Sequence, residues 1–412
     1  MVAISLLRLR EDIETLARFG RTSSGGVTRP AWSQPHEEAR AWLLGRMREA
    51  GLATWVDPAG NTFGMLSETP AESSDLGVLA GSHIDSVPEG GIFDGALGVL
   101  AGLECLRTLR EAGLRLARPL SLAAWSDEEG RYASLFGSTA FTGKLDPARL
   151  LTLASPDGER LVDAMARAGF NALEAPGAAR GRGSLAAYVE LHIEQGPHLE
   201  ALGVPIGVVT GIVGIARTRI VFIGEPDHAG TTPMERRKDS FLAAAEFSLK
   251  ARELVLKHGS ERSVTNIGVV EVKPGVPNIV PARTALIQEL RELNPGILDH
   301  LGRRCLSLAR RIANRRGLGV EVLPGSRTEP VQCARRVQAA IEGACRNLGL
   351  AFHPMPSGAG HDAQNLASVT EAGMIFIPSK RGRSHRPDEA SDWEAVERGA
   401  DVLLRTLLAL AS

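Results

Sequence analysis

Apolar residues follow two different spacings in the N-terminal half of the chain. Helical spacing occurs in 6–19, 35–50 and 95–109. Short continuous apolar runs, which are typical of buried strands, occur in 76–80, 119–126 and 185–193. A buried strand followed by a helix and a second buried strand forms a βαβ unit. We therefore predict an α/β fold with a mainly parallel sheet and helices on both of its faces.

The pattern changes at about residue 212 and changes back at about residue 330. Alternating strand patterns and helical patterns between these points occur in 216–224, 240–257, 264–272, 284–292 and 296–316. This mixture predicts a smaller inserted α+β sandwich. A helix, a strand and a terminal helix are then expected at 331–348, 372–378 and 393–410. We expect 1–212 and 330–412 to form one domain around a second domain, 213–329.

Composition and charge exclude several classes of protein. The 412 residues carry a formal net charge of −1, which favours no nucleic-acid partner. Acidic residues interrupt the apolar ones in 1–19, which indicates an amphipathic helix and not a signal peptide, and no apolar run reaches the roughly 18 residues of a membrane span. The cysteines lack CxxC spacing and fit reduced thiols in a cytoplasmic protein: Cys105, Cys305, Cys333 and Cys345.

The stretch GSHIDSVPEGGIFDG, residues 81–95, holds candidate metal ligands at the end of a predicted strand. Residues two apart share a face of a strand, so His83 and Asp85 point the same way. A metal-binding histidine usually donates its other ring N–H to a carboxylate, and Asp85 is placed to accept it. Asp94 follows the glycine-rich turn and could bridge two cations. The alternative interpretation is a hydrogen-bonded pair, with Asp94 serving only as a helix N-cap.

Two further strand ends carry the same kinds of side chain. Glu128 and Glu129 follow the predicted strand 119–126, and His192 lies at the end of the strand 185–193. Sites in open α/β sheets gather at the carboxyl ends of strands, so these residues are expected near His83. One glutamate can bind a metal while the other takes a proton from an attacking water. A solvated loop edge is the alternative for the glutamate pair alone.

The order of these residues, followed by His385, resembles the dinuclear amidohydrolases related to aminoacylases and carboxypeptidases. The chain is most similar to their hydantoinase/carbamoylase branch, which comprises N-carbamoyl-L-amino acid hydrolases, allantoate amidohydrolases and β-ureidopropionases. Four motifs carry the resemblance: HIEQG at 192–196, HAGTTPM at 228–234, PNIVP at 277–281 and GAGHDA at 358–363. No GxSxG elbow and no Walker A pattern is present, which disfavours serine hydrolases and nucleotide hydrolases.

The resemblance implies two divalent metal ions per subunit. One is expected on His83, Asp94 and His192, and the other on Asp94, Glu129 and His385, with Asp94 bridging. Glu128 is implied as the general base and Asp85 as a catalytic residue beside His83. Zinc suits such ligands best, and manganese, cobalt or nickel would also fit.

The resemblance also assigns the inserted domain as a lid and as the surface of a homodimer. His228 would stabilise the oxyanion, Asn278 and Arg291 would hold the substrate's carboxylate, and Gln195 and the backbone at Gly360 would line the acyl or carbamoyl pocket. From the residues alone, Asn278 could equally shape a turn, and Arg291 could be a surface charge.

Departures from the family pattern affect the substrate and leave the metal set intact. Glu289 replaces a shorter carboxylate near Arg291, and Arg383 and Arg386 flank the segment around His385. This basic rim favours a second anionic group on the substrate. The leading hypothesis is hydrolysis of the C–N bond of an N-carbamoyl or N-acyl amino acid. The alternatives are an allantoate amidohydrolase, an aminoacylase or peptidase of the same family, and a metal-free binding protein.

Overall fold

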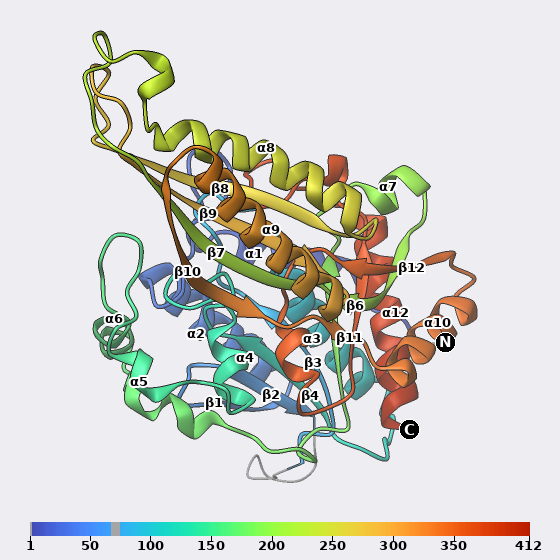
Figure 1. The fold of residues 1–412 in the computed structure, drawn as a ribbon. Helices are drawn as coiled ribbons and strands as arrows, with labels where there is room; N and C mark the ends of the chain where they lie inside the picture. Colours follow the sequence, from blue (N-terminus) through green and yellow to red (C-terminus); the bar gives the residue numbers. More distant parts are fainter. Residues whose placement is uncertain (1, 67–74) are drawn as a thin grey trace. The chain divides into compact units, whose positions relative to one another are not determined.

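The computed structural model describes residues 2–66 and 75–412, and the chain divides into two units. Unit 1 consists of Met1–Thr210 and Gln332–Ser412, and unit 2 is Gly211–Val331. Unit 1 is therefore built from two separate segments, which appear blue to green and red in Figure 1. The predicted α/β fold with a mainly parallel central sheet is confirmed.

Nine described strands form the sheet of unit 1. Its order is β1-β2-β4-β3-β5-β13-β6-β11, and β12 pairs with β6. The strands are β1 (Ala53–Val56), β2 (Thr62–Leu66), β3 (Val78–His83), β4 (Leu120–Trp125), β5 (Ala187–Ile193), β6 (Ile206–Ile212), β11 (Val331–Gln332), β12 (Phe352–Ser357) and β13 (Ala372–Ile377). The central strands β4, β3, β5 and β13 are parallel, while β1, β2 and β6 pair antiparallel to their neighbours.

The chain order reverses its direction across the sheet between β3 and β5. β3 is followed by β4 on one side, whereas β5 lies on the other side and has β13 beyond it. The pairing of β3 with β5 runs only from Val78↔Ala187 to Ala80↔Val189, although both strands continue. Ligand sites of open α/β sheets lie at such a switch point, beyond the carboxyl ends of the strands.

The long helices of unit 1 pack together against the sheet. They are α1 (Leu6–Leu16), α2 (Gln34–Glu49), α3 (Ala96–Glu111), α10 (Arg335–Asn347) and α12 (Trp393–Ala411). Their apolar residues join those of the central strands in one large core. α3 is buried from Ala96 to Leu109, and its glycines lie close to the sheet: a Cβ on Gly98 would be 2.4 Å from the Leu191 carbonyl oxygen. This close packing fixes α3 on the sheet.

Short helices complete unit 1. They are α4 (Phe136–Phe141), α5 (Pro147–Leu150), α6 (Leu161–Arg167), η1 (Ala172–Ala178), α7 (His198–Leu202), α11 (Asp362–Leu366) and η3 (Lys380–Gly382). A second, smaller core around Trp32 and Phe136 lies among α4, α5, α6 and η1.

Unit 2 has one sheet and two long helices. The sheet order is β10 (Gly319–Thr328), β7 (Gly214–Ile223), β9 (Arg283–Glu292) and β8 (Val264–Lys273), all antiparallel. α8 (Ser240–His258) and α9 (Pro295–Arg315) pack against it through a shared core, as Figure 1 shows, and η2 (Met234–Arg236) precedes α8. Asp239 and Asn294 cap the two helices by accepting N–H groups of their first turns.

Four strands were not predicted from the sequence, and one helix begins later than expected. β6, β10 and β12 were not predicted, and residues 331–332 of the expected helix 331–348 belong to strand β11. Within the described residues, all four cysteines are free and buried. None of the described helices combines the length and the apolar character needed to cross a membrane.

Candidate metal centre

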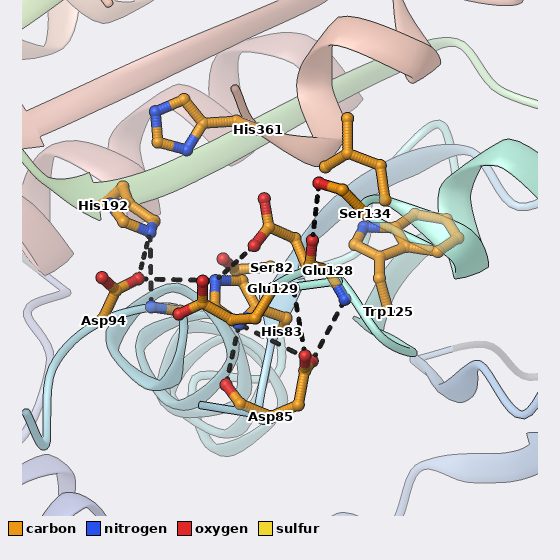
Figure 2. A network of polar contacts seen from close by, with 12 residues as sticks. Ser82, His83, Asp85, Asp94, Trp125, Glu128, Glu129, Ser134, His192 and His361 are labelled. Atoms are coloured by element: carbon orange, nitrogen blue, oxygen red, sulfur yellow. Dashed lines mark hydrogen bonds and ion pairs between the residues drawn. The ribbon is translucent and has the colours of Figure 1, made fainter. Parts of the chain in front are cut away.

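The carboxyl ends of β3, β4 and β5 bring the predicted ligands together. His83 is the last residue of β3, Glu128 and Glu129 follow β4, and His192 lies near the end of β5. Figure 2 shows these side chains and Asp94 turned toward one another. Their polar atoms form overlapping groups in which each ligand atom lies within 4.8 Å of the others. The structure therefore brings together residues that are far apart in the chain.

The first group consists of His83, Asp94 and His192. Asp94 Oδ1 lies 3.5 Å from His83 Nε2 and 3.2 Å from His192 Nε2. All three side chains are buried. Two imidazoles therefore face the same oxygen of one carboxylate.

The second group consists of Asp94, Glu129 and His385. His385 Nε2 lies 3.4 Å from the other oxygen of Asp94, Oδ2, and 3.5 Å from Glu129 Oε2. The side chain of His385 is 50% exposed, whereas that of Glu129 is 11% exposed. Asp94 thus presents one oxygen to each group, as a carboxylate that bridges two cations would.

The spacing of these atoms fits metal ligation. Ligands bound at 2.0–2.2 Å in tetrahedral geometry lie about 3.4 Å from one another, and the four nitrogen–oxygen distances in the two groups are 3.2–3.5 Å. Glu129 Oε1 is buried and has no hydrogen-bond partner among the described residues. Buried polar atoms are rarely left without a partner, so a cation would satisfy it. The donor set fits two divalent cations.

The far nitrogens of two imidazoles are held by backbone carbonyl oxygens. His83 Nδ1 donates to the carbonyl of Asp85 at 3.0 Å, and His192 Nδ1 donates to the carbonyl of Ile193 at 2.8 Å. With the proton on Nδ1, each Nε2 carries its lone pair on the side of the candidate site, where His192 Nε2 also accepts the N–H of Gly95 at 3.3 Å. Both rings are thereby oriented as metal ligands.

The carboxylate of Asp85 has a different partner from the one expected. Asp85 Oδ1 lies 3.7 Å from His83 Nδ1, which is too long for a hydrogen bond. Its two oxygens instead accept the backbone N–H groups of Glu129 at 3.1 Å and of Glu128 at 3.4 Å. The carboxylate of Asp85 therefore holds the glutamate pair, and the backbone carbonyl of Asp85 orients His83.

A second carboxylate supports the same turn. Asp127 has a positive φ of 50° and accepts the N–H groups of Arg131, Tyr132 and Ala133 at 2.7–3.0 Å. Ser134 donates to the carbonyl of Glu128 at 3.1 Å, as drawn in Figure 2. The glutamates are therefore fixed in a closed turn at the end of β4.

Burial and charge act on the pKa values of the cluster. Burial would raise the pKa of Asp94, but the imidazoles of His192, His385 and His83 outweigh it and hold that pKa well below its usual range. Burial raises the pKa of Glu128 well above its usual range, and burial together with Asp94 raises the pKa of Glu129 to about 7. Asp94 raises the pKa of His385 to about 9. Converging carboxylates thus create a negative potential that favours cations.

Glu389 ties together the two loops that meet at Asp94. Its Oε1 accepts the N–H groups of Phe93 at 3.2 Å and Asp94 at 3.1 Å, and its Oε2 lies 2.9 Å from Ser384 Oγ. Ser384 Oγ also lies 2.8 Å from Asp94 Oδ2. The contacts link the segment of Asp94 to the segment of His385. Sequence reasoning missed Ser384 and Glu389, although both lie near His385 in the segment GRSHRPDE, residues 382–389.

Gln195 contacts the bridging carboxylate directly. Gln195 Nε2 donates to Asp94 Oδ2 at 2.8 Å, and Gln195 Oε1 is buried without a partner among the described residues. The side chain therefore belongs to the centre itself. Gly360 lies in the loop after β12, and a Cβ there would meet nothing closer than Gln364 Oε1 at 3.5 Å.

His361 is a further member of the cluster that sequence reasoning missed. Its ring lies 4.6 Å from that of His192, centroid to centroid, and its Nε2 lies 2.9 Å from Ser357 Oγ. Burial, followed by the charge of His192, holds the pKa of His361 well below its usual range. The GAGHDA motif contains this residue, and its position next to Gly360 was the available signal.

The remaining predicted residues belong to unit 2. The N–H of Ala229 donates to the Asn278 carbonyl at 3.0 Å, and His228 forms a β-bridge with Ile279, so the loops of His228 and Asn278 lie side by side. His228 Nδ1 accepts the N–H groups of Gly230 and Thr231 at 3.0 and 3.2 Å. Arg291 lies on β9, and its Nε donates to Glu289 at 2.8 Å.

The two arginines of the expected basic rim share one carboxylate. Arg386 Nε donates to Asp388 Oδ1 at 3.0 Å, and Arg383 donates to Asp388 Oδ2. Asp388 therefore neutralises one of the two positive charges.

Comparison with known proteins agrees with this geometry. Residues 79–409 match the model of "Peptidase family M20/M25/M40". An N-carbamoyl-L-amino acid amidohydrolase of Geobacillus stearothermophilus is 39% identical over 406 residues, which cover 98% of each chain. An allantoate amidohydrolase of Escherichia coli (strain K12) is 35% identical over 408 residues, which cover 98% of this chain and 97% of that protein.

Solved structures are also similar to this chain. The crystal structure of an amidase of the hydantoinase/carbamoylase family from Burkholderia multivorans has a TM-score of 0.89 at 33% identity, covering 100% of this chain and 98% of that chain. Aminopeptidase PepT from Bacillus cereus, at 16% identity and a TM-score of 0.69, shares the fold. The chain therefore belongs to peptidase family M20/M25/M40, and within it to the hydantoinase/carbamoylase group of amidohydrolases.

Proposed function

We propose that this chain hydrolyses the C–N bond of an N-carbamoyl or N-acyl amino acid, with two divalent cations bound per subunit. The observation that carries the proposal is the position of Asp94, whose two oxygens face two separate sets of ligands. The two relatives named above support the substrate class. N-carbamoyl amino acids and allantoate both contain a ureido group, and the bond to be hydrolysed is a C–N bond of that group. An allantoate amidohydrolase is the second candidate, favoured by the E. coli relative.

Cations held by His83, Asp94, His192, Glu129 and His385 would supply Lewis-acid activation of water and of the scissile carbonyl group. Glu128 would act as the general base. Its Oε2 lies 3.5 Å from His83 Nε2, so the carboxylate reaches the first ligand group. Burial raises the pKa of Glu128, and a more basic carboxylate takes a proton from water more readily before returning it to the leaving nitrogen.

Unit 2 would act as the lid and contribute the groups that hold the substrate. Because His228 Nδ1 accepts two backbone N–H groups, the neutral ring carries its proton on Nε2. That N–H would donate to the oxyanion that develops during hydrolysis. Asn278 and the guanidinium of Arg291 would bind the substrate's carboxylate, for which a guanidinium offers two parallel donors.

Zinc is the proposed metal, because imidazole and carboxylate ligands in a four-coordinate arrangement suit it. Manganese, cobalt and nickel share this ligand preference in part. The four free and buried cysteines support the proposal of a cytoplasmic enzyme.

The proposed homodimer would form through unit 2. β8 is an edge strand of its sheet and exposes apolar side chains, including Val264 and Val270. Along α8, the exposed Leu242, Leu249 and Leu256 recur every seven residues and so lie on one helix face. Exposed edge strands and contiguous apolar faces are surfaces that proteins cover with a partner.

A substrate panel with Glu128→Gln tests the proposal. Wild-type protein loaded with zinc or manganese is expected to release ammonia from N-carbamoyl amino acids or allantoate, or a carboxylate from N-acyl amino acids. Loss of a general base lowers kcat by about 10²–10⁴-fold, while metal content measured by elemental analysis stays at two ions per subunit. Full activity of Glu128→Gln, or turnover that survives complete removal of metal, would contradict the assignment.

A further inference from the structure

A cavity lined mostly by charged residues lies in unit 1 at the far end of α3 from the metal centre. Its volume is about 420 Å³, and it is lined by residues of α1, α2 and α3, with Ala50 after α2. Asp94 precedes α3 and Glu111 ends it, so the length of the helix, about 24 Å at 1.5 Å per residue, separates the two places. Cavities of this volume hold small molecules. No role in the proposed reaction falls to the cavity.

Four guanidinium groups dominate its lining: Arg8, Arg46, Arg107 and Arg110. Two buried carboxylates lie behind them. Asp12 accepts from Arg46 at 3.0 Å and Arg107 at 2.5 Å, and Glu104 accepts two bonds from Arg8 at 2.7 and 3.0 Å. Four positive charges thus face two buried negative ones, which leaves two positive charges at the cavity.

The compensating negative charges lie on exposed side chains at the rim. Glu111 accepts from Arg8 at 2.6 Å, and Glu49 accepts from Arg46. These carboxylates are 61% and 63% exposed, and exposed ion pairs contribute only about 0–1 kcal/mol. A ligand could therefore displace them at low cost and receive the same guanidinium donors.

Arg110 has no carboxylate partner among the described residues. Its Nη1 donates to the carbonyl of Ala50 at 2.5 Å, a neutral acceptor. The guanidinium lies over Gly51, where a Cβ would be 1.1 Å from Nη1. Gly51 also has a φ of +69°, so this position accepts glycine and little else. The backbone thus leaves space for a guanidinium that has a carbonyl oxygen, and no carboxylate, as its partner among the described residues.

We propose that this cavity binds a small molecule with two negative charges, such as a dicarboxylate or a phosphate group, in place of the rim carboxylates Glu49 and Glu111. Guanidinium groups bind carboxylate and phosphate oxygens in pairs, and four of them surround the space. The site is separate from the substrate site of the proposed function and does not depend on it.

Calorimetric titration of the metal-loaded protein tests this site, with succinate and inorganic phosphate as separate probes at constant ionic strength. Saturable binding is expected from at least one of them. Glu49→Gln/Glu111→Gln removes the competing charges and is expected to tighten binding about two- to five-fold. Arg110→Gln is expected to weaken it about tenfold or more. Arg398→Gln, which removes an exposed arginine paired with Glu394 on α12, is the matched control and should leave binding unchanged.

Binding at the catalytic metals gives a different result. It would compete with substrate and would survive Arg110→Gln, and that outcome overturns the proposal. Absence of saturable binding by both probes overturns it as well. If Arg110→Gln fails to fold, as judged by circular dichroism, the Glu49→Gln/Glu111→Gln variant decides: unchanged or weaker binding in that variant contradicts the site.

Discussion

The Asp85 carboxylate accepts N–H groups of Glu128 and Glu129, and the Asp85 backbone carbonyl is what contacts the His83 ring. Sequence spacing correctly placed Asp85 beside His83 but could not distinguish the two oxygens, because a residue's carbonyl and carboxylate share one position in the chain. The two arrangements predict different consequences of mutation.

Asp85→Asn is expected to lower kcat about 10–100-fold while the two proposed metal ions remain bound. An asparagine offers one acceptor where the turn requires two, so Glu128 loses its fixed position while His83 stays oriented by the backbone. Kinetics together with elemental analysis measure the two effects separately. Asp157→Asn, an exposed aspartate paired with Arg131, is the control. Loss of a metal from Asp85→Asn would favour orientation of His83 by the carboxylate.

Glu389 is expected to act on metal affinity through Asp94 and Ser384. Glu389→Ala removes the acceptor of two backbone N–H groups and should weaken metal binding about 10–100-fold, as losses of supporting contacts generally do. Glu389→Gln retains an oxygen for these N–H groups and should restore part of the affinity. Competition with a chelator measures the affinity, and Glu394→Ala, an exposed residue of α12, is the control. Equal affinities in wild type and Glu389→Ala would contradict this role.

At the scale of elements, the periodic stretches were predictable and the irregular ones were not. The expected helix 95–109 corresponds to α3, and the expected strands 76–80 and 185–193 correspond to β3 and β5, which end at His83 and at Ile193, next to His192. β10 and β12 contain proline together with glycine or polar residues, so their hydrophobic patterns are weak. They are strands because they pair with neighbouring strands in the sheet. Contacts such as Glu389 with Asp94 join residues 295 positions apart and leave no local signal.

Gly95 lies between the candidate metal centre and α3. A substitution at Gly95 tests the geometry of this junction. Its φ is +65°, and a Cβ would lie 2.4 Å from the His83 ring. Gly95→Ala is therefore expected to displace His83 and reduce metal binding. Gly343, inside α10, has open space around its Cβ position, so Gly343→Ala should stabilise the protein by about 0.5–1 kcal/mol. Thermal unfolding and elemental analysis report both effects, and unchanged metal content in Gly95→Ala would contradict the first.

At the scale of the whole molecule, the predicted family follows from residues drawn from both ends of the sequence. The motifs of the family could be recognised in the sequence because each one lies within a few consecutive residues. The proposed homodimer follows only from the resemblance, because an exposed leucine on a helix is ordinary until its neighbours are known.

Leu249→Asp/Leu256→Asp is expected to convert the proposed dimer into monomers, because two charges would enter the apolar face of α8. Sedimentation velocity measures the mass in solution. Leu7→Asp changes a leucine that is equally exposed, at 68%, on α1 of unit 1, and should leave the mass unchanged. A dimer that persists in the double variant would place the contact elsewhere.

Because unit 1 consists of two separate segments, its proposed metal ligands are synthesised at different times. A ribosome that has reached residue 331 has released His83, Asp94, Glu128, Glu129 and His192, but His385 and Glu389 remain to be translated. Under the proposed ligand assignment, such a nascent chain could bind the first cation but would lack a ligand for the second. β13 would also be missing beside β5. The newly made protein would stay inactive until its last segment was synthesised and had packed against the first.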